Sequence, residues 1–129
     1  MREGSNIGLK DALDALVAQI PRLKIDLVVA PNFKLNDAKT AETLFRCVQE
    51  AITNTLKHGN ASEMHISLAQ QPHQVELAVK DNGHCQLSIH EGNGLKGMRE
   101  RIEKLRGHID INTARGFGLN IRIPTMEAL

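Results

Sequence analysis

Residues 38–58 read AKTAETLFRCVQEAITNTLKH, and this stretch decides the fold because its apolar residues recur at helical spacing. With about 100° of rotation per residue, one stripe along such a helix is apolar throughout. The stripe consists of Ala41, Leu44, Phe45, Val48, Ile52 and Leu56. We expect this stripe to pack against a sheet, with Asn36 or Asp37 as the N-cap and Gly59 at the C-terminal end.

The opposite side of this helix carries four polar groups of different chemistry. Glu50, Asn54, Lys57 and His58 are spaced at i, i+4, i+7 and i+8, so their side chains lie next to one another. A solvated surface would explain the glutamate and the lysine, but asparagine is a mediocre helix former in a helix interior. Glu50 and Asn54 offer hard oxygens that suit Mg²⁺, and Lys57 and His58 can face phosphate oxygens. The residues alone leave two interpretations open: a solvated surface or a magnesium–phosphate site.

The remaining pattern predicts one domain with several shorter elements around the long helix. The expected helices are residues 9–20 and 95–105, and the expected strands are 24–30, 63–69, 75–80, 108–112 and 119–123. Residues 81–94 show no sustained period and are expected to form a loop. This order of elements predicts an α+β fold, a two-layer α/β sandwich with a mostly antiparallel sheet.

A short turn, Asp81-Asn82-Gly83, directly follows one of the predicted strands. Such a turn can be no more than a strand exit, because Asp, Asn and Gly all favour turns. Alternatively, the Asp81 carboxylate accepts a hydrogen bond from an exocyclic amine such as that of adenine, and Gly83 leaves room for the ring. The turn alone does not decide between these interpretations.

Glycines at 92, 94 and 97 open the predicted helix 95–105 with the pattern G-x-G-x-x-G. Such a start can place backbone N–H groups and the positive helix end against phosphates. The pattern fails as a dinucleotide fingerprint because a long loop replaces the expected strand–turn–helix unit, and no GK[ST] follows to make a Walker loop. The glycines fit a mobile lid as well as a fixed phosphate cradle.

Composition excludes several classes of function. The chain has 129 residues, a formal net charge of +1 and 2% aromatic residues, so neither charge nor base stacking favours nucleic acid as a partner. Cys47 and Cys85 belong to no CxxC pair, which favours reduced thiols in a cytoplasmic protein. The sequence has no 18-residue apolar run and no signal-peptide pattern at its start.

Four motifs occur in one order: EAITNTLKH (50–58), DNG (81–83), GNGLKGMRER (92–101) and GFGLNIRIP (116–124). Together they resemble the ATP-binding catalytic domain (HATPase_c) of sensor histidine kinases, within the gyrase–Hsp90–histidine kinase–MutL superfamily. The stretch GLKGMRERIEKLRGHIDI (94–111) is most similar to the nitrate-sensor-like subgroup. The resemblance runs from about Gly8 to Pro124, so the whole chain is expected to be one catalytic domain.

The resemblance implies a Bergerat-type fold, with a mixed, mostly antiparallel sheet and helices on one face. It implies a protein histidine kinase that uses ATP and Mg²⁺. Asn54 would hold Mg²⁺, and Glu50 would orient a magnesium-bound water or help to activate the acceptor. The implied ATP-binding residues are Asn54, Lys57, His58, Asp81, Gly83, Gly92, Gly94, Leu95, Gly97 and Met98. Phosphoryl transfer would then depend on positioning and charge neutralisation.

Two departures from the family pattern leave alternatives open. Cys85 stands where the first glycine box usually has a second glycine, and Leu119 replaces the threonine that often ends the last box. These departures favour a non-catalytic ATP-binding regulatory module as one alternative. A serine kinase of the anti-sigma-factor type, which shares the fold, is the other, and the GMRER stretch argues against it.

The partners follow from what a complete histidine kinase needs. None of the six histidines lies in a helix suited to carry a phosphoacceptor, so we expect a fragment of a longer kinase. The expected partners are the dimerisation and phosphoacceptor helix of the parent kinase and a downstream response regulator. The isolated domain is expected to be a cytoplasmic monomer, and the parent to be associated with a membrane.

Overall fold

The computed structural model describes residues 8–31, 33–35, 37–58, 61–83, 93–113 and 116–125. Three helices and five strands follow one another along the chain, and every element predicted from the sequence is present. They are α1 (Leu9–Ala18), β1 (Lys24–Val29), α2 (Ala38–His58), β2 (Glu63–Gln71), β3 (Gln74–Asp81), α3 (Asn93–Lys104), β4 (His108–Asn112) and β5 (Gly118–Pro124). The last helix begins at Asn93, two residues earlier than predicted.

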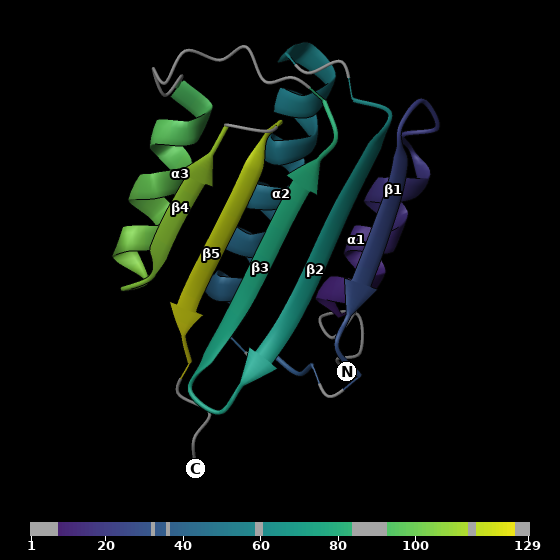
Figure 1. Cartoon of the computed structure of the whole chain (residues 1–129). Coiled ribbons are helices and arrows are strands. Elements are labelled where there is room, and N and C mark those ends of the chain that lie inside the picture. The colour runs from purple at the N-terminus through teal and green to yellow at the C-terminus, as the bar shows by residue number, and fades with distance from the viewer. Residues whose placement is uncertain are drawn as a thin grey trace.

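The five strands form one mixed sheet in the order β1-β2-β3-β5-β4 (Figure 1). Only β1 and β2 run parallel, and the other neighbours are antiparallel. The parallel pair follows from α2, which connects β1 to β2 and provides the crossover that parallel strands require. The predicted mostly antiparallel sheet is confirmed.

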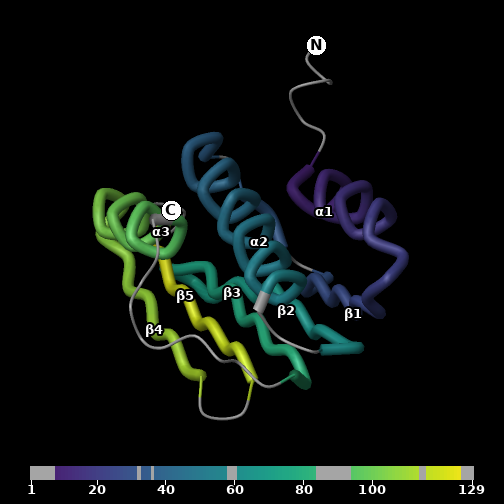
Figure 2. Tube along the Cα trace, turned by 90° about the horizontal axis from the view of Figure 1, so that it is seen from above, coloured from purple at the N-terminus to yellow at the C-terminus, as the bar shows by residue number. Residues whose placement is uncertain are grey.

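All three helices cover the same face of the sheet, with α2 between α1 and α3 (Figure 2). Side chains alternate between the two faces along each strand, and every second residue of the central strands is apolar and buried. These apolar residues form one face of the sheet, and the helices cover that face. The buried strand residues are Met64, Ile66, Leu68, Val75, Leu77, Val79, Leu119, Ile121 and Ile123. The two-layer sandwich with helices on one face is therefore confirmed.

The N-terminal end of α2 is capped by Asp37, one of the two predicted candidates. Its Oδ1 accepts a hydrogen bond from the Lys39 backbone N–H at 3.1 Å, and its Oδ2 accepts one from the Thr40 hydroxyl at 2.7 Å. These contacts satisfy one backbone donor of the first turn and hold the helix start in place. Asn36 and Gly59, the other predicted end residues, lie outside the described residues.

The packing stripe of α2 differs from the predicted one near the C-terminal end. Leu56 is 38% exposed, whereas Thr55 is only 2% exposed. On a helical wheel Thr55 lies within about 20° of Val48, while Leu56 lies about 80° away from it. The prediction that Leu56 faces the sheet was therefore wrong, because apolar character was given more weight than position on the wheel.

Candidate functional site

A buried carboxylate at the end of β3 joins three parts of the chain. Asp81 is 2% exposed, and its Oδ1 accepts hydrogen bonds from the backbone N–H groups of Gly83 and Phe117, both at 3.0 Å. Its Oδ2 accepts the hydroxyl of Thr55 on α2 at 2.7 Å. An ionised carboxylate offers about four acceptor positions, so about one remains for another donor. Asp81 is held in one orientation and still has capacity for a ligand N–H.

Two glycines allow the backbone to close around this carboxylate. Gly116 has a φ of +91°, and a Cβ on it would lie 2.7 Å from Asp81 Oδ1 and from the Gly83 carbonyl oxygen. A Cβ on Gly83 would lie 2.8 Å from the backbone nitrogen of Ala61. Gly83 is therefore needed for a close approach to Ala61. Whether it also leaves room for a ligand ring stays a prediction.

Glu50 faces α3, where its carboxylate lies beside Gly94, and is therefore not on the side opposite the core stripe as the sequence suggested. Asn54 lies one helical turn further along α2. Both residues are half-buried. The Nδ2 atom of Asn54 is buried and has no hydrogen-bond partner within the described residues. A buried donor left unpaired costs about 1–3 kcal/mol. This amide is the polar group in the site that most clearly lacks a partner.

The first turn of α3 packs directly against the Glu50 carboxylate. A Cβ on Gly94 would overlap that carboxylate and lie 2.8 Å from its Oε1 atom. By contrast, the nearest atom to a Cβ on Gly97 would be Nη1 of Arg101, at 3.7 Å, which is ordinary contact. A side chain at Gly94 would therefore displace the Glu50 carboxylate, whereas one at Gly97 would meet no close contact. The positive end of α3 lies beside the glutamate.

The other predicted site residues are placed in different ways. Leu95 is 5% and Met98 2% exposed, so both side chains belong to the hydrophobic core, and their predicted contact with nucleotide remains untested. Lys57 is exposed on α2. Gly92, Cys85 and the side chain of His58 lie outside the described residues. The structure thus brings Glu50 and Gly94 together, and joins Asp81 to the same end of α2 through Thr55.

Sequence reasoning missed Thr55 and Phe117, which hold Asp81 in place. Thr55 carried a usable signal, since a threonine between polar Asn54 and apolar Leu56 falls within the packing stripe on a helical wheel. Phe117 donates through its backbone N–H, so its side chain gave no indication of this role.

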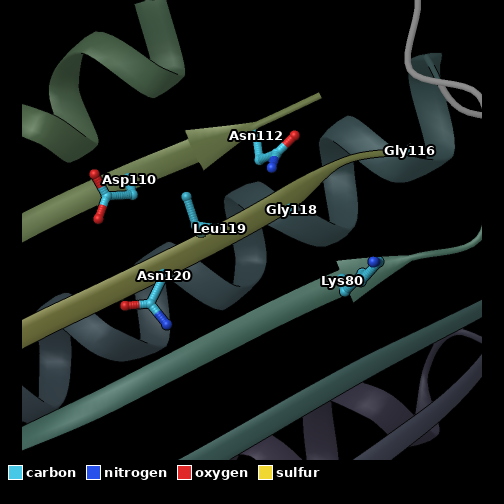
Figure 3. A pocket seen from close by; sticks show the side chains of 7 residues that line it. All are labelled: Lys80, Asp110, Asn112, Gly116, Gly118, Leu119 and Asn120. Carbon is cyan, nitrogen blue, oxygen red and sulfur yellow. The ribbon is translucent and has the colours of Figure 1, made fainter. Parts of the chain in front are cut away.

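Two cavities of about 380 Å³ lie in different places. One lies between α2 and α3 and is lined by Glu50 and Gly94, but not by Asp81. The other lies on the sheet face away from the helices, where Lys80, Asp110 and Asn120 extend toward solvent (Figure 3). The second cavity has no contact with the polar flank of α2, so only the first belongs to the candidate site.

The donors present suit a metal that is shared with a ligand. Among the described residues, no group of three or more His, Cys, Asp and Glu side chains is arranged to hold a metal ion. Glu50 supplies carboxylate oxygens and Asn54 an amide oxygen, while the unpartnered Nδ2 of Asn54 is a donor that suits a phosphate oxygen. Mg²⁺ commonly uses one or two carboxylates together with substrate phosphates. The residues therefore fit Mg²⁺ bound jointly by protein and phosphate.

None of the helices in the described part of the chain has the length and the apolar character needed to cross a membrane.

Comparison with known proteins agrees with this geometry. The chain is 42% identical over 83 residues to the signal transduction histidine-protein kinase/phosphatase DegS of Brevibacillus brevis, covering 62% of the chain and 22% of DegS. It is 32% identical over 123 residues to the nitrate/nitrite sensor protein NarX of Escherichia coli K12, covering 88% of the chain and 20% of NarX. The chain thus spans about a fifth of the length of these curated relatives.

Solved structures and a family model lead to the same assignment. The ATP-binding domain of PrrB from Mycobacterium tuberculosis superposes with a TM-score of 0.66 at 25% identity, covering 90% of both chains. Residues 39–128, well over half of the sequence, match the family described as "Histidine kinase-, DNA gyrase B-, and HSP90-like ATPase". With the fold and the polar flank of α2 in agreement, the chain belongs to the family of histidine kinase-, DNA gyrase B- and HSP90-like ATPases.

Proposed function

We propose that this domain binds ATP with Mg²⁺ and transfers the γ-phosphate to a histidine on a dimerisation helix of a longer sensor kinase. The observation that carries the proposal is that two polar groups near the C-terminal end of α2 can still make hydrogen bonds, namely Asp81 at the end of β3 and Asn54 on α2. Asp81 keeps about one free acceptor position next to Thr55, and Asn54 has a buried amide nitrogen without a partner. A nucleotide needs an acceptor for its base amine and donors for its phosphate oxygens, and the Asn54 amide nitrogen is such a donor.

Each end of the site has a separate task in this proposal. Asp81 accepts a hydrogen bond from the exocyclic amine of adenine, while Gly83 and Phe117 keep the carboxylate from rotating. Asn54 would hold Mg²⁺ at the phosphates, and Glu50 would act on the metal through a bound water. When bound, Mg²⁺ supplies charge neutralisation on the phosphate oxygens. Lys57 and His58 contribute further positive charge, and the glycines at the start of α3 allow the backbone to approach the phosphates.

The chemical step needs little covalent work from the protein. A ring nitrogen of the acceptor imidazole attacks the γ-phosphorus, the bond from that phosphorus to the β–γ bridging oxygen breaks, and ADP leaves. The proton on the other ring nitrogen passes to a base, and in this proposal that base is the Glu50 carboxylate. Positioning and charge neutralisation account for most of the rate enhancement in phosphoryl transfer.

The names of the relatives support the wider setting of this proposal. DegS is a histidine-protein kinase and NarX a nitrate/nitrite sensor, so a longer kinase with a phosphoacceptor helix and a downstream response regulator is the setting we infer. We infer that the domain is a monomer when isolated and that it acts on the cytoplasmic side of a membrane-associated parent.

The test mixes the 129-residue chain with a helix fragment that carries the acceptor histidine, in the presence of labelled ATP and Mg²⁺. Label on histidine that is lost in acid supports the proposal. ATP binding without any transfer supports a non-catalytic module instead, and acid-stable label on a serine of a separate protein supports the anti-sigma-factor type of kinase. A mixture without Mg²⁺ is the control for metal dependence.

A further inference from the structure

The cavity between α2 and α3 has two arginines in its wall that the roles above do not use. Arg46 on α2 and Arg101 on α3 both line this space of about 380 Å³, together with Glu50 and Gly94. Such a volume accommodates a phosphate group with bound water. The cavity therefore places two guanidinium groups near the glutamate that the proposed mechanism assigns to the reacting end of the nucleotide.

Arg101 extends along α3 toward the start of that helix. Its Nη1 atom lies 3.7 Å from the position that a Cβ on Gly97 would occupy. Long helical side chains lean toward the helix N-terminus, which here brings the guanidinium toward Gly94 and Glu50. The buried thiol of Cys47 gives independent evidence that Arg101 and Glu50 lie near each other. Burial raises the pKa of Cys47 to about 12, while the Arg101 charge lowers it and the Glu50 charge raises it, so both charges act near one sulfur.

Both guanidinium groups are available to an added anion. Within the described residues, no carboxylate lies within ion-pair distance of Arg101. Arg46 contacts Glu42 at 3.7 Å, but these side chains are 53% and 66% exposed, and such surface pairs contribute little. A neighbouring cavity shares both arginines and adds Lys39 and Lys104, so cations outnumber carboxylates along this groove. An anion is attracted here by the local field.

The order of groups along α2 determines which anion fits. Thr55 holds Asp81 at the end proposed for the base, and Asn54 comes directly before it. Glu50 lies one helical turn before Asn54 in the sequence, and Arg46 lies one turn before Glu50. Each turn spans about 5.4 Å along the helix axis. A nucleotide with its base at Asp81 and its phosphates along this flank would direct its last phosphate toward the two arginines.

We propose that Arg101, assisted by Arg46, contacts the terminal phosphate of the nucleotide and gives the site its preference for a triphosphate over a diphosphate. This inference rests on the proposed function. Arginine suits the role because its planar group can donate two parallel hydrogen bonds to phosphate oxygens. After transfer, ADP lacks the group that the arginines hold, so product release becomes easier.

The test is calorimetric titration of the 129-residue chain with ATP and with ADP at one fixed Mg²⁺ concentration. Arg101→Ala is expected to weaken ATP binding about tenfold or more, because a charged hydrogen bond is lost, and to change ADP binding less than about twofold. Arg101→Lys should recover part of the ATP affinity, and Arg46→Ala should show the same selective loss to a smaller extent. Lys24→Ala, which removes the same charge from an exposed position on β1 outside the groove, is the control and should leave the ATP-to-ADP ratio unchanged.

Several outcomes would overturn the inference. An unchanged ATP-to-ADP ratio in Arg101→Ala, or an equal loss for both nucleotides, removes Arg101 from the terminal phosphate. A loss of transfer to the acceptor helix with a retained ratio would assign the arginines to the protein partner instead. In each of these cases ATP still binds the unaltered chain and the proposed function stands. If the unaltered chain binds neither nucleotide, the proposed function and this inference both fail.

Discussion

The hydroxyl of Thr55 donates a 2.7 Å hydrogen bond to Oδ2 of Asp81, which fixes the last part of α2 to the end of β3. Both residues are 2% exposed, so neither group has water as a replacement partner. Buried donors and acceptors are costly to leave unmatched, and this contact therefore contributes to stability as well as to the geometry of the site.

Thr55→Val is expected to lower the free energy of unfolding by about 1–3 kcal/mol, because it keeps the shape of the side chain but leaves Oδ2 of Asp81 without its donor. Urea denaturation followed by circular dichroism measures the change. Thr55→Ser retains the hydroxyl and is the matched control, which should lose less stability. Equal losses in the two variants would mean that packing by the threonine methyl group matters more than the hydrogen bond.

Asp81→Asn is expected to weaken ATP binding more than GTP binding. The amide oxygen can still accept from Gly83 and Phe117, but the other atom becomes a donor and cannot accept the adenine amine. Titration with both nucleotides gives the comparison, and a thermal melt confirms that the variant is folded. A parallel loss for ATP and GTP would exclude Asp81 from base recognition.

Asn54→Ala should separate binding from stability. The amide nitrogen has no partner within the described residues, so its removal is expected to leave the free energy of unfolding unchanged or slightly higher. Nucleotide binding should become less dependent on Mg²⁺, as measured by titrating the metal at constant ATP. Asn120→Ala, which removes an amide on the sheet face away from the helices, serves as the control for metal dependence. A magnesium dependence equal to that of the unaltered chain would show that Asn54 does not serve the metal.

Two glycines of α3 should respond in opposite ways to alanine. Gly97→Ala has free space and is expected to raise the free energy of unfolding by about 0.5–1 kcal/mol through helix propensity. Gly94→Ala gains the same propensity but displaces the Glu50 carboxylate, so phosphoryl transfer should fall while the fold persists. Denaturation curves and transfer rates on both variants check this contrast. Full activity in Gly94→Ala would mean that the position of Glu50 is unimportant.

Cys47 should be unreactive in the folded chain. Burial raises the pKa of Cys47 to about 12, so the thiol stays protonated at neutral pH. Little thiolate is then present to react with an alkylating reagent. Because the pKa is raised on folding, the thiol's contribution to stability is complete below about pH 9 and declines as the pH rises toward 12. Iodoacetamide labelling of a Cys85→Ser variant tests this, with denatured protein as the positive control. Rapid labelling of folded protein at pH 8 would contradict the burial of Cys47.

The sequence predicted the elements well because local signals determine them. Apolar alternation marked the strands, and helical spacing marked α2 with its observed bounds. The burial of Thr55 could have been read from its position on the helical wheel, but its partner could not, because Asp81 lies 26 residues away. The position of Glu50 beside Gly94 likewise follows from packing between helices that are distant in the sequence.

The candidate site was predicted less completely than the fold. Spacing identified Glu50 and Asn54 as candidates, and the turn identified Asp81, but only the structure shows that a Cβ on Gly94 would overlap the Glu50 carboxylate. Leu95 and Met98 are buried in the core, and Met98 also lines the cavity between α2 and α3, so their contact with nucleotide stays a prediction.

The single carboxylate that joins α2, β3 and the segment before β5 also limits how this domain can evolve. Given the role proposed for Asp81 in base recognition, a descendant that recognised a different base would have to replace this residue, and the same replacement would loosen three separate parts of the chain. Such a lineage would first have to accumulate compensating changes elsewhere in the core. Base preference should therefore drift slowly, while exposed positions outside this network are free to change.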